Sequence, residues 1–290
     1  MDHLESKREL TPGLYLLPGP LGNLGDLSQR AIEVLTGADL VAAEDTRRTV
    51  KLLNYLGLKK PMISYREQNH HRSWPGIDRV LAGGGRVALL SDAGAPTISD
   101  PGAGLVAAAV DTGYAVFPIP GPSAIICALM ASGFISSSFT FAGFLPSTGP
   151  KRRTRLEELK NRPESLVFFE SPHRLADCLA DMADILGPRS ALMAREMTKI
   201  HEEYLHLDLP ALAENVRLKP RRGEVTLVVS PPDAAESRPA STDDLAAIEA
   251  FILQDDRPTK ILATALSEAY GRPRKEIYAL VLAVRNRQKD

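Results

Sequence analysis

The chain has 290 residues, 44% of them hydrophobic and 24% charged, with a formal net charge of −1. This composition excludes a disordered or fibrous protein, and the length exceeds one typical domain, so we expect two lobes and a small appendage. The charge balance excludes a uniformly basic surface, so any nucleic-acid binding must come from local basic patches.

Short apolar runs alternate with segments of helical period through residues 1–121. Strands are predicted at 14–17, 40–43, 62–65, 87–90 and 116–119. Helices are predicted from about Asp26, from about Thr46, near 77–82 and over 105–111, with Asp26 and Gln29 resembling a capping box. This β-α-β-α rhythm predicts an N-terminal α/β lobe with a parallel sheet covered on both faces.

The pattern becomes less regular over residues 122–230. Helices are predicted at 124–131, 156–160 and 173–186, and strands at 139–144, 166–170, 191–196 and 224–229. The uneven connections between these strands predict a second α/β lobe with a mixed sheet. Residues 231–242, rich in Pro, Ala and Ser, are typical of a linker, and 243–290 are expected to form a small helical module.

Export and membrane insertion are not expected. The N-terminal MDHLESKREL lacks the apolar stretch of a signal peptide, and the longest apolar run, 124–131, is far shorter than the roughly 20 residues that span a bilayer. Cys127 and Cys178 are the only cysteines, which favours a reducing compartment. We therefore expect a cytoplasmic protein.

Three loops rich in glycine and proline each follow a predicted strand: residues 18–26, 91–104 and 120–124. In an open parallel sheet, ligands bind outside the carboxyl ends of the strands, where glycine lets the backbone approach closely. Each loop taken singly is compatible with a simple turn, but their position at one edge predicts a shared pocket.

Known ligand fingerprints do not match these loops. Gly19, Gly22 and Gly25 are spaced by three, unlike the G-x-G-x-x-G pattern of dinucleotide-binding proteins, and no phosphate-binding P-loop occurs. His201 and His206 are five residues apart, so they would not share one helix face as zinc ligands do. No metal site is expected.

Eight stretches, in chain order, resemble the ribosomal RNA small subunit methyltransferase I family: LYLLPGPLGNLGDLSQRAIEVL, ADLVAAEDTRRTVKLL, ALLSDAGAPTISDPGAGLV, PIPGPSAIICAL, FAGFLP, FFESPHRL, AREMTKIHEE and RGEVTLVV. These are 16S rRNA cytidine 2′-O-ribose methyltransferases of the tetrapyrrole methylase fold. The resemblance runs from Leu14 to about Val229, and the tail resembles the family's helix-turn-helix-like module. Gly19 is a departure, because the family usually carries Thr there.

The resemblance implies a homodimer that binds S-adenosylmethionine in a cleft between two lobes and acts on 16S rRNA of the small ribosomal subunit. The matching cofactor-binding positions are Pro18, Ser91, Asp92, Ala93, Gly94, Ile98, Ser123, Ala124, Phe169 and Ala194. Asp92 is equally suited to capping the turn that follows it.

A ribose hydroxyl is a poor nucleophile, so a positioned base, or a cation that favours the alkoxide, would assist methyl transfer. The candidate catalytic residues near strand ends are Glu44, Asp45, Glu170 and Lys199, with Arg195 and Glu196 close by. The sequence does not choose among them, and a structural ion-pair network with Arg47, Arg174 or Arg195 explains each acid equally well.

Candidate RNA contacts are Arg47, Arg48, Lys151, Arg152, Arg153, Arg272, Arg274 and Lys275. Residues 257–290 hold eight Lys/Arg against three Asp/Glu, which favours a phosphate-binding tail, although a basic run is also typical of a solvated helix. Two alternatives remain open at this stage: a small-molecule methylase of the tetrapyrrole type, and a nucleic-acid-binding regulator with a vestigial cofactor lobe.

Overall fold

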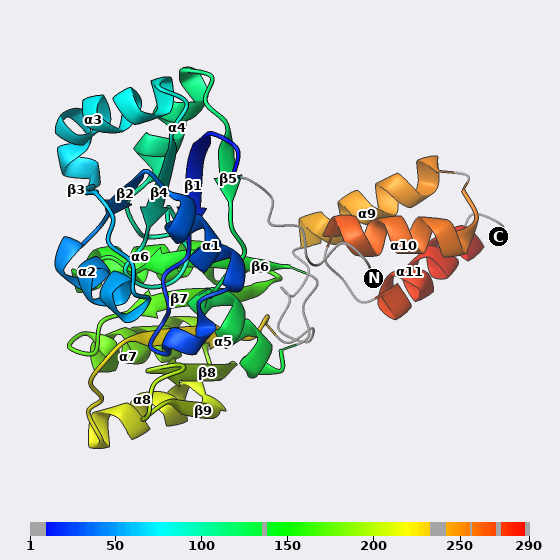
Figure 1. The fold of residues 1–290 in the computed structure, drawn as a ribbon. Coiled ribbons are helices and arrows are strands. Elements are labelled where there is room, and N and C mark those ends of the chain that lie inside the picture. The colour runs from blue at the N-terminus through cyan, green and yellow to red at the C-terminus, as the bar shows by residue number, and fades with distance from the viewer. Residues whose placement is uncertain (1–9, 135–137, 233–241, 256, 271–273, 288–290) are drawn as a thin grey trace, which may run out of the picture.

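The computed structural model describes residues 10–134, 138–232, 242–255, 257–270 and 274–287 (Figure 1). Two α/β lobes lie one above the other in Figure 1, and three helices form a separate module. No helix in these ranges combines the length and the apolar character needed to cross a membrane.

The first lobe is built on a five-stranded sheet in the order β3-β2-β4-β1-β5, in which every neighbouring pair is parallel. Its strands are β1 (Gly13–Leu17), β2 (Leu40–Ala43), β3 (Met62–Ser64), β4 (Arg86–Leu90) and β5 (Val116–Pro118). The parallel sheet predicted from the β-α rhythm is therefore confirmed.

Helices cover both faces of this sheet, because alternate residues of each strand point to opposite sides. Tyr15 and Leu17 pack with α1 (Gln29–Gly37) and α2 (Thr46–Tyr55) in one buried cluster. Leu14 packs with α3 (His70–Ala82) and α4 (Ala103–Asp111) in a second cluster on the other face. Burial on both faces explains why these strands read as short apolar runs and not as an alternating pattern.

The second lobe holds a five-stranded mixed sheet in the order β6-β7-β10-β8-β9, in which only β6 and β7 are parallel. Its strands are β6 (Phe139–Phe144), β7 (Ser165–Glu170), β8 (Ser190–Arg195), β9 (Glu203–Asp208) and β10 (Val225–Val229). The predicted mixed sheet is confirmed.

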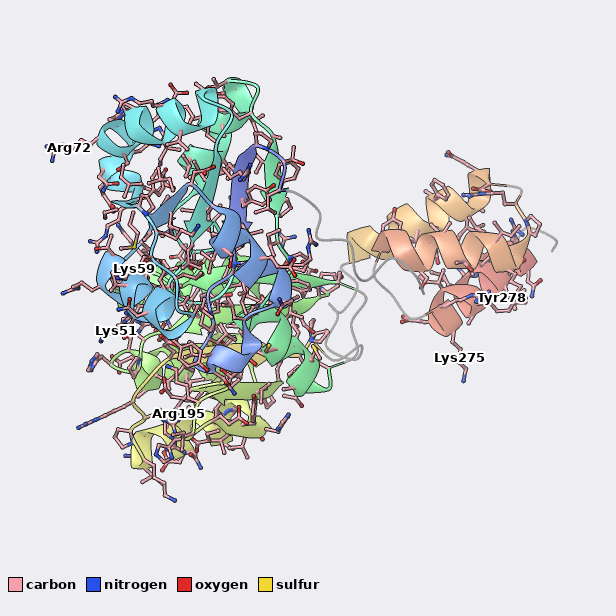
Figure 2. The ribbon with its side chains drawn as sticks, in the orientation of Figure 1. Lys51, Lys59, Arg72, Arg195, Lys275 and Tyr278 are labelled. Atoms are coloured by element: carbon pink, nitrogen blue, oxygen red, sulfur yellow. The ribbon has the colours of Figure 1, made fainter. Side chains whose placement is uncertain are left out.

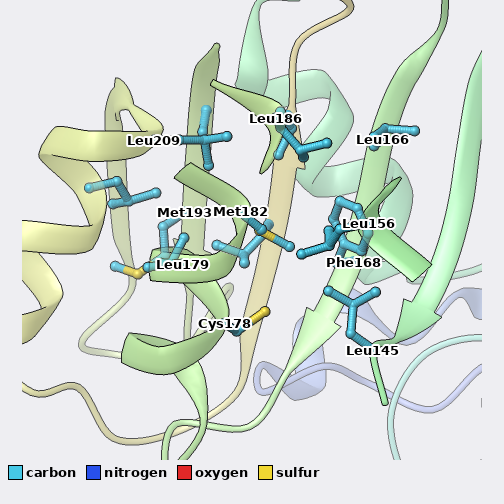
Figure 3. Close-up of a cluster of buried hydrophobic side chains, with 14 of the residues drawn as sticks. Leu145, Leu156, Leu166, Phe168, Cys178, Leu179, Met182, Leu186, Met193 and Leu209 are labelled. Atoms are coloured by element: carbon cyan, nitrogen blue, oxygen red, sulfur yellow. The ribbon is translucent and has the colours of Figure 1, made fainter. Parts of the chain in front are cut away.

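The two faces of the second sheet have different covers. Helices α6 (Gly149–Leu159), α7 (Leu175–Leu186) and α8 (Leu209–Leu218) bury one face in the largest apolar cluster, which Figure 3 shows around Phe168, Leu179 and Met182. On the opposite face, α5 (Ala124–Ser132) packs against β8 and β10. The chain crosses from the first lobe to the second through this helix.

The C-terminal module consists of α9 (Thr242–Gln254), α10 (Thr259–Tyr270) and α11 (Arg274–Arg287). Ile248, Leu262, Leu266, Ile277 and Val281 form its buried core, so one apolar side from each helix meets at the centre. The predicted linker lies largely outside the described residues.

Several predicted boundaries were wrong. The helix expected from Asp26 begins at Gln29, because Ser28 caps it by accepting a hydrogen bond from the Ala31 amide at 3.2 Å, while Leu24–Asp26 form a separate 3-10 turn. The helix expected near 77–82 begins at His70, whose Nδ1 lies 3.0 Å from the Tyr65 hydroxyl. His70 and His71 therefore open this helix.

The second lobe departs from the prediction in three places. α6 begins at Gly149, seven residues before the expected start, and α8 was not predicted. β9 was also missed, although its alternating burial is typical of an edge strand. His206 lies on β9 and its Nε2 is 2.8 Å from the Ala131 carbonyl oxygen on α5.

Candidate active site

Three loops leave the first sheet from the same edge. β1 lies between β4 and β5 and is parallel to both, so the segments that follow these strands all start at their carboxyl ends. β2, on the other side of β4, brings Glu44 and Asp45 to this edge. The prediction that the glycine-rich loops share one edge is confirmed.

The first two loops are joined by their backbones at Gly19 and Gly94. The Gly19 amide donates to the Gly94 carbonyl at 3.0 Å, and the Gly94 amide donates back to the Gly19 carbonyl at 2.8 Å. A Cβ atom at Gly19 would lie 2.1 Å from the Ser91 carbonyl oxygen, far inside contact distance. This close approach leaves no room for a side chain at residue 19 in this structure.

Three carboxylates, those of Glu44, Asp92 and Asp100, lie next to the junction of the first two loops. The Asp92 side chain accepts a hydrogen bond from the Asp45 amide at 3.2 Å, and the Asp92 amide donates to Glu44 at 3.4 Å. Asp100 accepts a hydrogen bond from the Ser91 hydroxyl at 2.5 Å. Burial raises the pKa values of Glu44, Asp92 and Asp100, and repulsion between neighbouring carboxylates adds to the rise. A cation bound among them would relieve this unfavourable charge.

These acids line a cleft of about 330 Å³, which we call the acidic cleft. Its lining residues are Glu44, Asp45, Arg48, Arg66, Asp92, Ala93, Asp100 and Glu224. Glu224 precedes β10, so the second lobe contributes one wall. Five carboxylates against two guanidinium groups give the cleft a negative character suited to a cationic ligand.

The second loop is held in an unusual backbone conformation. Thr97 and Ser99 have φ angles of 72° and 62°, in the left-handed region that non-glycine residues rarely adopt. The Glu67 carboxylate accepts a hydrogen bond from the Gly102 amide at 2.6 Å and fixes the end of the loop. Conformations of this kind persist where surrounding contacts hold them, and they are concentrated at functional sites.

Lys199 comes from the second lobe and reaches the first loop. Its Nζ lies 2.8 Å from Glu196 and 3.1 Å from Glu224. A Cβ atom at Gly22 would lie 2.2 Å from Lys199 Cγ, so the lysine chain crosses directly over this glycine. Burial lowers the pKa of Lys199, but its bonds to the two glutamates outweigh that effect and raise it. Lys199 is therefore a held cation and not a proton acceptor.

Phe169 and Ala194 lie in one cross-strand row of the second sheet. Thr226 of β10 is paired with Phe169 of β7 on one side and with Ala194 of β8 on the other. Residues paired in this way have side chains on the same face, here the face that α5 covers. Ser123 caps α5 by accepting a hydrogen bond from the Ile126 amide at 3.5 Å, and Ala124 packs in the same cluster. The second-lobe cofactor candidates therefore converge.

Glu170 points the other way. It follows Phe169 in β7, so its side chain lies on the opposite face, where it is fully buried and paired with Arg174 at 2.9 Å. Glu170 also accepts a hydrogen bond from the Ser171 amide at 2.7 Å. These contacts give it a structural role away from the acidic cleft and remove it from the candidate bases.

Asp45 is also engaged. Its carboxylate caps α2 through the Arg47 amide at 2.8 Å and pairs with the Arg47 guanidinium at 2.7 Å. The hydrogen bonds from Arg47 lower the pKa of Asp45, which makes it a weak base. Of the candidate acids, Glu44 keeps the most suitable environment, because burial raises its pKa and its carboxylate faces the cleft.

The basic candidates fall into two groups. Lys151, Arg48, Arg274 and Lys275 are exposed and, within the described residues, none forms a close ion pair except Arg48, which lies 3.5 Å from Asp92. Arg152 is only 6% exposed and pairs with Asp181 at 2.7 Å, so it belongs to the packing between α6 and α7 and not to an RNA surface. Arg153 pairs with Asp181 and Asp184, and Arg272 lies outside the described residues.

Four residues of the site were not singled out from the sequence: Arg66, Asp100, Glu224 and Thr226. Asp100 lies within the second glycine-rich loop, so its loop was recognised and its carboxylate was not. The alternation of β10 would place Thr226 on the face of Val228, which was a usable signal. No local sequence pattern predicts Glu224 as a site residue, because its neighbours in the cleft come from the other lobe.

The fold and this cleft define a class of methylase. The family model for tetrapyrrole (corrin/porphyrin) methylases matches residues 13–213. Solved structures agree on the fold: uroporphyrin-III-C-methyltransferase from Thermus thermophilus has a TM-score of 0.55 at 20% identity, covering 76% of this chain and 94% of that one. Diphthine synthase, at 13% identity, has a TM-score of 0.55 and covers 75% of this chain and 89% of its own.

The curated relatives are more specific. Ribosomal RNA small subunit methyltransferase I of Mesorhizobium japonicum is 42% identical over 96% of this chain and 94% of its own length. The protein of the same name from Thermotoga maritima is 44% identical over 75% of this chain and 97% of its own. The chain belongs to the tetrapyrrole methylase family and, within it, to the ribosomal RNA small subunit methyltransferase I group, as its motifs predicted.

Proposed function

We propose that this protein transfers a methyl group from S-adenosylmethionine to the 2′-hydroxyl of a cytidine ribose in 16S rRNA. The observation that carries the proposal is the acidic cleft between two lobes, in a chain that is 42% identical to a small subunit rRNA methyltransferase along 96% of its length. A second T. thermophilus uroporphyrin-III C-methyl transferase structure, with a TM-score of 0.54, is complexed with S-adenosylhomocysteine, which supports the cofactor.

The residues of the cleft fit this cofactor. S-adenosylmethionine carries a sulfonium and an amino group, and the half-buried Glu44, Asp92 and Asp100 favour such cations. Within the part of the chain that the structure describes, the Thr198 hydroxyl beside Lys199 is buried and has no hydrogen-bond partner. We assign cofactor binding to Pro18, Ser91, Asp92, Ala93, Gly94, Ile98, Ser123, Ala124, Phe169 and Ala194, with Thr226 added from the strand row.

The cofactor supplies an already activated methyl group, so the protein's task is to align the ribose and remove its proton. Glu44 is assigned as the base, because a carboxylate with a raised pKa accepts a proton more readily at neutral pH. Lys199, held by Glu196 and Glu224, is assigned to favour the developing alkoxide by its charge. Asp45 is assigned to hold α2 and the neighbouring backbone in place.

RNA binding is assigned to Arg47, Arg48 and Lys151 on the lobes and to Arg274 and Lys275 on the module. The module as a whole is not basic: residues 243–290 hold eight Lys/Arg and eight Asp/Glu. Two of its cations are engaged within the module: Arg257 pairs with the Asp255 carboxylate, and Arg285 donates a hydrogen bond to the Asp255 backbone carbonyl. Two other cations, Lys260 and Arg274, line a shallow hollow of about 410 Å³, beside Thr264. Figure 2 shows Lys275 projecting from the same module.

We also propose that the protein is a cytoplasmic homodimer. Ile126 and Met130 are four residues apart on α5, so they share a helix face, and they are 46% and 80% exposed. A contiguous exposed apolar face is typical of a subunit interface. Light scattering should give twice the chain mass for the wild type and the single mass for Met130→Asp.

The proposed activity is tested by incubating the protein with methyl-labelled S-adenosylmethionine and small ribosomal subunits that lack the modification. The expected result is label on 16S rRNA that nuclease digestion returns as 2′-O-methylcytidine. A parallel reaction with uroporphyrinogen tests the small-molecule alternative. Label on the porphyrinogen alone, or on no substrate, contradicts the proposal. Glu44→Gln should lose most of the labelling even at cofactor concentrations that saturate the variant.

A further inference from the structure

A second hollow in the first lobe is lined by residues of the first loop, of α2 and of the end of β4. It has a volume of about 220 Å³. Leu52 of α2 and Leu90 of β4 form its buried floor, and Leu24 forms a wall that is 40% exposed. Arg48 and Lys51, one turn apart on α2, line its rim. We call this feature the apolar hollow.

The apolar hollow opens beside the acidic cleft. Arg48 and Asp92 line both, and Ser91, whose hydroxyl binds Asp100, lies on the boundary. The part of a bound molecule that extends out of the hollow would therefore point towards the carboxylates of Glu44 and Asp92. The hollow is thus continuous with the place where we assign the chemistry.

Its size and chemistry restrict the occupant. Sites for drug-sized ligands measure roughly 300–1,000 Å³, so this volume suits one flat ring system and not a whole cofactor. The floor is aliphatic, while the rim carries cations. Lys51 is exposed and, in the part of the chain that the structure describes, has no ion-pair partner. An apolar flat group with an attached anion, as in a nucleotide, matches both features.

We propose that the apolar hollow receives one nucleobase of the RNA substrate, with Arg48 and Lys51 contacting the phosphates on either side. This inference rests on the proposed rRNA methylation and names how its substrate is held. Bases in RNA loops are recognised when they are splayed out and packed on side chains, and arginine planes stack on them. Seating a base here would place its ribose, or the neighbouring one, at the entrance to the acidic cleft.

Two variants test the two parts of the hollow, each with a matched control. Leu24→Asp makes the exposed wall polar, and Leu218→Asp makes the same change at the end of α8, where the side chain is 66% exposed. Lys51→Glu reverses the rim charge, and Lys59→Glu reverses a charge on the same lobe outside the hollow; both lysines are labelled in Figure 2.

The assay is methylation of small ribosomal subunits, with cofactor affinity measured separately by calorimetry. Leu24→Asp should raise KM for the subunits roughly tenfold, the order expected for losing the packing of one base, and leave the cofactor Kd unchanged. Lys51→Glu should raise KM and make its dependence on salt shallower by about one phosphate contact. Both controls should behave as the wild type.

Three results overturn the inference. A KM within twofold of wild type for both variants shows that no base is seated there. A weaker cofactor Kd with unchanged KM shows that the hollow holds the adenine of the cofactor. A wild type that does not label 16S rRNA at all removes the proposed function, and this inference with it, so the two failures are distinguishable.

Discussion

The junction of the first two loops predicts the effect of adding one carbon atom. In Gly19→Ala, the new Cβ would start 2.1 Å from the Ser91 carbonyl oxygen, and reaching ordinary contact requires a shift of about 1 Å. That shift breaks the two hydrogen bonds between Gly19 and Gly94, of 3.0 and 2.8 Å. The atoms in the way belong to the backbone of residues 91–93, so no side chain can move aside.

The cost can be worked out from these contacts. Two backbone hydrogen bonds contribute about 1 kcal/mol each, and forcing an extra methyl into packed structure costs about 1–3 kcal/mol, so we expect a loss of about 3–5 kcal/mol. Thermal unfolding should show the melting temperature falling by roughly 6–20 °C. Gly25→Ala in the same loop is the control, because its Cβ would meet only the tip of the Asn23 side chain at 3.2 Å. If Gly19→Ala melts with the wild type, the reasoning about this junction is refuted.

Three further predictions concern the charged groups. Burial raises the pKa of Glu44 above its ordinary 4.5, so protonation on acidification removes a negative charge from the cleft; cofactor affinity measured by calorimetry should fall as pH drops towards that pKa, and Glu44→Gln should flatten the profile. The stability of the unliganded protein should follow the opposite trend. Because the pKa of Glu44 is raised in the folded state, its contribution to the free energy of unfolding is lost as pH rises through that pKa. Urea unfolding of the wild type should show this loss and Glu44→Gln should lack it; a wild type that gains stability over the same pH range relative to the variant contradicts the prediction. Lys199→Met should lower kcat about 100-fold with cofactor Kd little changed; an unaltered kcat in single-turnover assays excludes a role for its charge. Arg152→Leu should cost about 3 kcal/mol in urea unfolding, because it leaves the 2.7 Å partner Asp181 with Arg153 alone, while RNA and cofactor binding stay as in wild type.

The sequence predicted what depends on chain order and strand direction. Parallel strands send their following loops to one edge, so three glycine-rich loops after three such strands had to meet once the sheet was recognised. The face on which each strand residue lies was harder to predict, although the sequence contained the information. Because side chains alternate along a strand, Phe169 lies on the face that α5 covers and Glu170 lies on the opposite face, which α6 and α7 cover.

Partners distant in sequence could not be predicted. Arg152 looked like part of a basic surface because Asp181, which buries it, lies 29 residues away on another helix. Glu224 and Asp100 face each other across two lobes, and no local pattern joins them. The division into 1–121, 122–230, 231–242 and 243–290, and the roles given to individual site residues, stay predictions.

The Lys199 side chain of the second lobe can lie directly over Gly22 of the first lobe because glycine has no side chain. Lys199 is bound to its own lobe through two glutamates, so an atom added at Gly22 must either displace the lysine from these ion pairs or move the two lobes apart. A series of residues of increasing size at position 22 would separate the lobes by increasing amounts wherever the lysine keeps its ion pairs. Methylation rates measured across that series would show how strongly the activity depends on the distance between the lobes.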